Sequence, residues 1–400
     1  MSAATTIRSE GGLLPRDVLT RIADLDSELG GLTPDAYHLA RAERIGEAIA
    51  RSWSRLTGAW EIFATERDQL PAGDQAGKLT RERWQLPLLA ELGYGRIVQH
   101  AAVDLDGRSY PVFAEYQHSP IHLVGAGVPL DRRSAGVRGA AEQSPHSLVQ
   151  ELLNRSSERL WGIVTNGLSL RLLRDNVTLT RQAYVEFDLE SIMASEAYED
   201  FALLWLCCHQ SRVEAERAEE CWLELWTQAA ERDGARALGD LRVGVERAIE
   251  VLGRGFLAQP ANDQLHGDLG DGALDGQSYY RELLRIIYRL LFLFVAEDRD
   301  VLLLPEDGTV ERREARRRFD AYYGTARLRR LAGRSRGGRA HDLYEQVKLL
   351  TDWLHEGGQP VLALPALGSA LWDPQTTPHL RDARLGNEAL LEAVRELAFV

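Results

Sequence analysis

The segment Trp161–Leu173 (WGIVTNGLSLRLL) constrains the fold of this chain more than any other, because it reads as two strands joined by a tight turn. Branched and apolar residues flank Asn166-Gly167 on both sides, and Asn-Gly favours the type I′ turn of a two-residue hairpin. A helical pattern over Ser147–Arg159 precedes the hairpin. The chain is therefore expected to contain a β-sheet with helices on its faces.

Residue patterns along the rest of the chain predict an α+β fold in four parts. We expect helices over residues 1–70, an α+β part over 71–190, a helical region over 191–260 and a second helical region over 277–400. The residues between the last two parts, Ala258–Gly276, are rich in Gly, Asp, Pro and Asn and predict a linker. Candidate strands besides the hairpin are Ile97–Val103, Tyr110–Ala114, Ile121–Val124 and Ala183–Phe187.

Apolar residues at helical spacing predict the main helices. Trp53, Leu56, Trp60 and Phe63 share one face of a helix in the first part, where we expect them to pack in the core. A further helix over Thr80–Leu92 should end at Gly93 and be kinked or shortened by Pro87. The other predicted helices are Tyr198–Thr227, Asp240–Leu257, Tyr279–Asp298, Asp342–His355 and Asn387–Leu397.

The charge of the chain is unevenly distributed. Its net charge is −13, but residues 311–339 hold 11 Arg and 3 acidic residues, so this segment carries 11 − 3 = +8 and the remainder −13 − 8 = −21. Such a concentrated basic segment is compatible with contact to the phosphates of nucleic acid. The alternative is a solvated, partly disordered loop.

Several features predict a cytoplasmic protein with no membrane segment. Two of the three cysteines, Cys207 and Cys208, are adjacent, which argues against a disulfide framework. The N-terminus has no apolar leader, and the strongest apolar run, Leu290–Ala296, is far shorter than the ~20 residues of a membrane helix. The chain stops on the apolar residues Ala398-Phe399-Val400, which suggests a truncated protein or the first part of a longer one.

Several segments, in this order, resemble the N-terminal region of large adenine-specific DNA methyltransferases. Members of that family belong to type IIG restriction-modification systems and to BREX- and DISARM-type phage defence. The resemblance covers most of residues 80–400. The matching segments are Thr80–Gly95 (TRERWQLPLLAELGYG), Pro120–Gly125 (PIHLVG), Leu130–Arg133 (LDRR), Pro145–Ser156 (PHSLVQELLNRS), Leu160–Asn176 (LWGIVTNGLSLRLLRDN), Tyr184–Ile192 (YVEFDLESI), Tyr279–Leu303 (YYRELLRIIYRLLFLFVAEDRDVLL) and Leu367–Pro374 (LGSALWDP).

The resemblance implies a restriction-endonuclease-like sheet domain, then a mostly α-helical region that leads into a methyltransferase domain. The full-length family uses S-adenosylmethionine, which needs a glycine-rich turn after a strand, and grips a flipped adenine with an Asn-Pro-Pro-Tyr-type motif. Neither motif is in this sequence, so no cofactor and no methylation are expected from this chain alone. DNA is the expected partner, together with a separate methyltransferase domain or other subunits of a defence system.

A Mg²⁺-dependent nuclease is the competing interpretation. An endonuclease-like site needs an acidic residue, then an acidic-x-Lys pair on the next strand, to hold Mg²⁺ and position water. The only lysines, Lys78 and Lys348, complete no such pattern. The remaining nuclease candidates are Asp106 and the E-x-Q variant of the motif, Glu115 and Gln117. The alternative is that the carboxylates are surface residues beside an Asp-Gly turn.

Other candidate chemistry is weaker. His118 and His122 lack a third zinc ligand. The cysteines lack zinc-ligand spacing, so helix packing is favoured for the cysteines. The charged run at residues 297–300 is read as the exit of a buried helix, with Arg299 paired to a neighbouring carboxylate.

The sequence therefore predicts a chain that engages DNA or scaffolds a methyltransferase without chemistry of its own, with a protein-interaction module of a defence complex as a third reading. Guanidinium groups bind phosphate bidentately and stay charged at physiological pH. The candidate DNA-contacting residues are Arg312, Arg313, Arg316, Arg317, Arg318, Arg327, Arg329 and Arg330, followed by Arg171 and Arg174 beside the hairpin.

Overall fold

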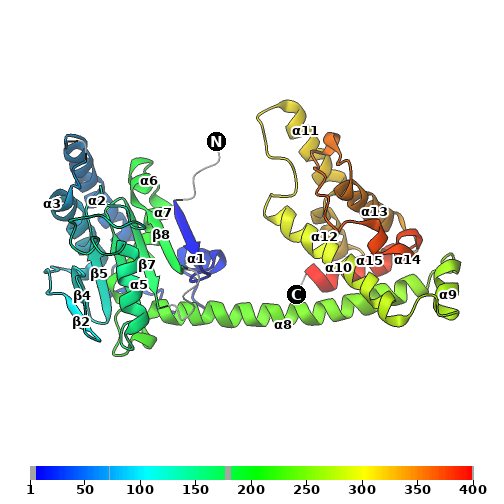
Figure 1. The fold of residues 1–400 in the computed structure, drawn as a ribbon, viewed down its shortest axis with the longest axis horizontal. Coiled ribbons are helices and arrows are strands. Elements are labelled where there is room, and N and C mark those ends of the chain that lie inside the picture. The colour runs from blue at the N-terminus through cyan, green and yellow to red at the C-terminus, as the bar shows by residue number, and fades with distance from the viewer. Residues whose placement is uncertain (1–5, 72, 176–181, 399–400) are drawn as a thin grey trace. The chain divides into compact units, whose positions relative to one another are not determined.

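A computed structural model describes residues 6–71, 73–175 and 182–398 (Figure 1). Asn176, at the end of one segment quoted above, and the terminal pair Phe399-Val400 lie outside the described residues. The chain divides into two compact units, residues 1–233 and 234–400, and the boundary falls within the long helix α8 (Trp222–Leu257). The mixed α+β class is confirmed: the first unit holds the β-sheet, and the second is helical.

The first unit is built on a six-stranded mixed sheet with the order β1-β8-β7-β6-β5-β4. Strands β5 and β6 are parallel and are joined through helix α5 (Pro145–Arg155), while every other neighbouring pair is antiparallel. The strands are β1 (Ile7–Glu10), β4 (Ala114–Tyr116), β5 (Ser119–Leu123), β6 (Trp161–Thr165), β7 (Ser169–Arg174) and β8 (Tyr184–Asp188).

A separate two-stranded sheet pairs β2 (Val103–Leu105) with β3 (Arg108–Tyr110). The strand predicted over Ile97–Val103 is therefore wrong except for its last residue. The prediction over Tyr110–Ala114 joined the end of β3 to the start of β4, although Pro111 has no N–H to continue a ladder. The sequence also gave no signal for β1, the edge strand that pairs with β8.

Each face of the six-stranded sheet has its own core, because successive side chains of a strand point to opposite faces. Leu170 and Leu172 of β7 join the larger core, which contains Trp84 and side chains of the N-terminal helices. Leu173 and Val164 join a smaller core under α5. The two faces thus bury apolar residues on both sides of the hairpin, as expected for a sheet covered by helices.

The helices of the first unit include α2 (Ile45–Asp68), in which Leu56, Trp60 and Phe63 are buried as predicted. Residues 77–94 form the predicted helix that ends at Gly93, whose φ of +87° is outside the helical region. Two π-helical stretches flank the segment that contains Pro87, where the ring removes a backbone donor. The remaining helical elements are α1 (Arg16–Ala23), η1 (Pro34–Tyr37), α3 (Gly77–Thr80), η2 (Arg81–Gln85), α4 (Leu86–Leu89), η3 (Ala90–Tyr94), α6 (Leu189–Ala194), α7 (Tyr198–Cys208), η4 (Gln210–Arg212) and η5 (Ala218–Glu220).

The second unit packs helices around two apolar clusters. Its helix α13 (Asp342–His355) has the predicted bounds, and α10 (Gly276–Asp298) and α15 (Asn387–Ala398) lie within three residues of theirs. The predicted linker is wrong in its middle, which forms α9 (Asp263–Gly270). The other elements are α11 (Val310–Arg318), η6 (Phe319–Tyr323), α12 (Thr325–Arg334), η7 (Pro360–Leu362), η8 (Pro374–Thr376) and α14 (Pro378–Asp382).

Within the described residues, no helix combines the length and the apolar character needed to cross a membrane.

Candidate functional site

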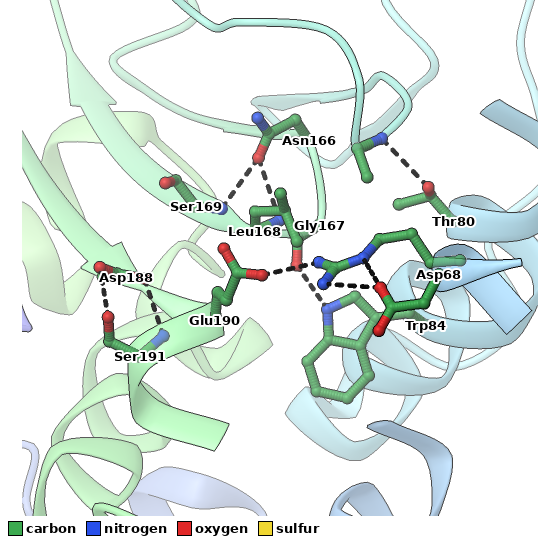
Figure 2. Close-up of polar contacts among 12 residues, drawn as sticks. Asp68, Thr80, Trp84, Asn166, Gly167, Leu168, Ser169, Asp188, Glu190 and Ser191 are labelled. Carbon is green, nitrogen blue, oxygen red and sulfur yellow. Dashed lines mark hydrogen bonds and ion pairs between the residues drawn. The ribbon is translucent and has the colours of Figure 1, made fainter. Parts of the chain in front are cut away.

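The Asn-Gly hairpin is present, but its turn is not of type I′. That type needs a positive φ at both central residues, and of the turn residues only Gly167 has one, +82°. The Asn166 N–H donates to the Ser169 carbonyl across the loop at 3.3 Å, so Gly167 and Leu168 are the two residues between the bonded pair. The Asn166 side chain accepts the N–H groups of Leu168 and Ser169 at 3.0 and 2.8 Å (Figure 2).

The helical segment at residues 77–89 lies directly against this turn. Trp84 Nε1 donates to the carbonyl of Gly167 at 2.7 Å (Figure 2), and Gln85 Nε2 donates to the carbonyls of Val124 and Thr165 at 2.8 and 3.1 Å. Since Val124 follows β5 and Thr165 ends β6, Gln85 bridges the carboxyl ends of the two parallel strands. Carboxyl ends of parallel strands are where open α/β sheets bind ligands, so this edge is the candidate site.

A cavity of about 170 Å³ opens at this edge. His122 of β5 and Gln85 line it, and both side chains are almost completely buried. Burial lowers the pKa of His122 to about 4, against a weaker opposing effect of its bond to Gly139, so the imidazole is neutral at pH 7. The other lining residues are Gly77, Arg81, Gln99, Pro111, Val112, Phe113, Leu123, Val124, Gly125, Val137 and Arg138.

The predicted nuclease residues are not assembled into a metal site. Asp106 is exposed in the turn between β2 and β3, outside the six-stranded sheet. Glu115 on β4 is held by Arg159 through bonds of 2.5 and 3.3 Å. Gln117 lies in the next turn, where its Oε1 accepts the N–H of Ala215. In the described part of the chain, no group of three or more His, Cys, Asp or Glu residues could hold a metal ion.

Neither lysine lies beside the predicted nuclease residues. Lys78 is exposed on α3, and Lys348 lies on α13 of the second unit, paired with Glu345 at 2.8 Å. Cys207, Cys208 and Cys221 are free and buried, in line with the packing role predicted for them.

Arg171, predicted to contact DNA, is instead a buried structural residue. Its side chain binds Asp131 bidentately at 2.6 and 2.8 Å and Glu186 at 2.5 Å, and its guanidinium lies 4.5 Å from the ring centroid of Tyr184. Burial alone would lower the pKa of Arg171, but the bonds to the two carboxylates outweigh it and raise the pKa. A guanidinium engaged in this way is not available to a phosphate.

Arg174 is similarly committed. It forms two bonds of 2.8 Å to Glu224, and Trp161 Nε1 donates to the same carboxylate at 3.2 Å. Arg174 therefore ties the end of β7 to the first turns of α8, within the first unit.

The arginine-rich segment is helical over residues 310–323 and 325–334 and irregular over 335–339, and its eight candidate DNA-contacting arginines divide into two groups. The first group is bound internally. Arg329 binds Asp298 bidentately at 2.6 and 2.9 Å, Arg316 binds Asp300 and the carbonyl of Leu304, and Arg318 donates to the carbonyl of Val361. Arg312 lies 3.5 Å from Asp307, and Arg327 donates to Gln346 at 3.2 Å.

The second group faces solvent. Arg313 and Arg317 are four residues apart on α11, hence on one face of that helix, and Arg330 is exposed on α12. Arg313 makes only a long bond of 3.4 Å to the carbonyl of Thr309 in its own helix. Among residues 6–71, 73–175 and 182–398, no carboxylate pairs with these three arginines, so their charges are free to meet an external anion.

The charged exit of α10 has a role that the sequence did not reveal. Glu297 accepts the N–H groups of Thr325 and Ala326 at 2.7 and 2.8 Å and so caps the start of α12. Its neighbour Asp298 binds Arg329. The predicted pairing of Arg299 with a neighbouring carboxylate is not found among the residues that the structure describes. The roles of Gln85 and Glu297 were missed because their partners are distant in sequence, although Glu297 lies in the charged run at residues 297–300 that the sequence analysis singled out.

No protein-family model, no curated protein and no solved structure matches this chain.

Proposed function

We propose that this chain is the N-terminal, DNA-engaging or scaffolding portion of a site-specific DNA adenine N6-methyltransferase from a restriction-modification or phage-defence system. In this role the chain contacts the phosphates of DNA and carries no catalytic step itself. S-adenosylmethionine and the methyl transfer belong to a methyltransferase domain whose motifs this sequence does not contain.

The observation that carries the proposal is the free pair Arg313 and Arg317 on α11, together with Arg330 on α12, since the other arginines of α11 are ion-paired to Asp307, Asp300 and Glu314. Like charges four residues apart on a helix repel each other by a few tenths of a kcal/mol, and a bound phosphate would relieve that repulsion. The acidic remainder of the chain repels a polyanion, which confines the contact to this surface.

The local arrangement of the resembling segments gives further support. Thr80–Gly95, Pro120–Gly125 and Leu160–Asn176 are far apart in sequence, yet Trp84 and Gln85 bond directly to the other two. Segments that carry a resemblance and also bond to one another are expected where a family retains one structural unit.

Fluorescence anisotropy with a labelled DNA duplex tests the proposal. Reversing three charges in R313E/R317E/R330E should weaken binding and reduce the slope of log K against log salt by about 3, because each phosphate contact contributes about 0.9. Charge reversal at Arg316 or Arg318 would be a less specific test, because these side chains also bind backbone carbonyls of the second unit and so contribute to its stability.

The matched control is R41E/R96E/R232E, which changes the net charge equally at exposed arginines outside the segment. If both triple variants lose affinity equally, the contact is a general charge effect and the arginine assignment fails. If neither variant loses affinity, the chain does not use these arginines to bind DNA. Absence of DNA binding by the unmodified chain leaves only the scaffolding half of the proposal.

A further inference from the structure

Strand β1 forms one edge of the six-stranded sheet and pairs there only with β8. The Asp188 N–H donates to the Thr6 carbonyl at 2.8 Å, so these two residues are a hydrogen-bonded pair of the antiparallel ladder. Hydrogen-bonded and non-hydrogen-bonded pairs alternate along such a ladder. The backbone groups of Arg8 and Glu10 therefore also point towards β8, where their partners are residues 186 and 184.

The outer side of β1 carries backbone groups that are free to pair. By the same alternation, the N–H and C=O groups of Ile7 and Ser9 point away from β8. Within residues 6–71, 73–175 and 182–398, no strand and no backbone hydrogen bond from another segment occupies this side of β1. An edge with free N–H and C=O groups is a template for a further strand.

The charges of β1 indicate which strand fits this edge. Arg8 and Glu10 are exposed on one face of β1, and in the described part of the chain neither of them forms an ion pair. A complementary antiparallel strand needs a carboxylate opposite Arg8 and a cation opposite Glu10. The same four residues running in the opposite direction supply both groups in the required order. The edge is therefore complementary to β1 of a second copy.

Only one register of two antiparallel β1 strands pairs these charges. The outward residues have to face each other, so Ile7 lies opposite Ile7, Ile7 opposite Ser9, or Ser9 opposite Ser9. The first register pairs neither charge, and the second places Arg8 against Arg8. The third places Arg8 of each copy opposite Glu10 of the other, and two-fold symmetry forms this pair twice. Gly11 and Gly12, with φ of +70° and +71°, end the strand and limit the overlap to these few residues.

We propose that the outer edge of β1 binds β1 of a second copy of this chain, antiparallel and with Ser9 opposite Ser9. The two Ser9 residues exchange backbone hydrogen bonds, and two Arg8–Glu10 pairs flank them. Because the interface is small, the chain is in a concentration-dependent equilibrium between monomer and dimer. The interface uses neither Arg313 nor Arg317, so it stands or falls separately from the function proposed above.

Sedimentation velocity of the full chain, from about 1 μM to about 1 mM, measures this weak association. In a dimer of R8E four acidic side chains face each other, and in a dimer of E10R four basic ones do. Each variant should therefore dimerise at least about tenfold more weakly than the unmodified chain. The matched control is R16E, which makes the same charge change at an exposed position in α1 and should leave dimerisation unchanged.

Mixing the two variants provides a rescue that depends on the register. One copy then supplies only acidic side chains at the two positions and the other copy only basic ones, so both cross-strand pairs are opposite in charge. The mixture of R8E and E10R should associate as well as the unmodified chain. The double variant R8E/E10R, which exchanges the two charges within one chain, should also dimerise. Misfolding of a single variant could not produce either rescue.

A proline substitution tests the backbone pairing. The Ser9 N–H points outwards, so S9P removes a donor that the second copy needs and that β8 does not use. S9P should abolish dimerisation and leave the fold of the first unit intact, as judged by circular dichroism and urea unfolding.

The outcomes decide between the proposed pairing and its absence. Dimerisation that is weakened in R8E and in E10R and restored in their mixture supports the proposal. A monomer at every concentration, or a dimer that persists in R8E and in folded S9P, overturns it. A mixture of R8E and E10R that associates no better than either variant alone also overturns it.

Discussion

Gly167 is the position at which the turn and the helix over it are most tightly coupled. A Cβ placed there would lie 2.4 Å from Cγ2 of Thr80, and the residue has a φ of +82°. Alanine in the left-handed region costs about 1–2 kcal/mol, and overfilling a packed site typically costs about 1–3 kcal/mol. We therefore expect G167A to lower the free energy of unfolding by roughly 2–5 kcal/mol, a large part of the stability of an ordinary domain.

Urea unfolding followed by tryptophan fluorescence measures this loss in the first unit, which contains every tryptophan except Trp353 and Trp372. G107A is the matched control, because Gly107 also lies in a hairpin turn with φ +75° but has open space around the added methyl. The free energy of unfolding of G107A should decrease only by the cost of alanine at a positive φ, about 1–2 kcal/mol.

A second substitution separates the contact from the backbone strain. T80S removes only Cγ2 and keeps the hydroxyl that accepts the N–H of Ala126 at 3.1 Å. In the double variant G167A/T80S the overlap is gone, so its loss should be smaller than the sum of the single losses by about 1–2 kcal/mol. If G167A behaves like G107A, or if T80S rescues nothing, the inferred packing of the turn against the helix is wrong.

Three other predictions follow from the structure. E297A leaves the Thr325 and Ala326 N–H groups of α12 without an acceptor and should cost about 2 kcal/mol; hydrogen exchange at these two amides should accelerate, and unchanged exchange would remove the capping role. Burial lowers the pKa of His122 and of His146 to about 4. As the pH is lowered from 6.5 to 4, only the unfolded chain gains these protons, so the free energy of unfolding decreases. In H146Q the slope of unfolding free energy above pH 4.5 should decrease by up to about 1.4 kcal/mol per pH unit, and an unchanged slope would contradict the neutral buried imidazole. Supercoiled plasmid with Mg²⁺ should stay intact with the unmodified chain and with D106A alike, whereas nicking that D106A abolishes would restore the nuclease interpretation.

What the sequence predicted well was local. The hairpin and helices such as α13 depend on the alternation of apolar and polar residues, on turn residues and on helical spacing. These patterns occur within a short stretch of sequence and can be recognised from it alone. Strand β1 was missed because four residues of mixed polarity form a strand only through pairing with β8, at the far end of the unit's sequence. Helix α9 was missed because its glycines and aspartates disfavour helix, and Leu265 is its only buried side chain.

The candidate site shows the same division. From its sequence position, Arg171 on a strand beside a turn is expected to be exposed. In the structure Asp131 and Glu186 bind its side chain, so the predicted DNA contact is a buried ion pair instead. Conversely, Arg313 and Arg317 differ from Arg316 in being exposed and in having no ion-pair partner among the described residues. Sequence locates basic residues, but which of them keep a free charge depends on partners that folding supplies.

The residues predicted for a nuclease do not assemble a site for Mg²⁺. Activation of water by Mg²⁺ requires carboxylates, because this hard cation is held by charged oxygen ligands. Glu115 is bound by Arg159, Asp106 is exposed in the turn between β2 and β3, and Gln117 accepts the N–H of Ala215. Binding of Mg²⁺ by these residues would therefore require both a rearranged β2–β3 turn and the loss of the Glu115–Arg159 ion pair.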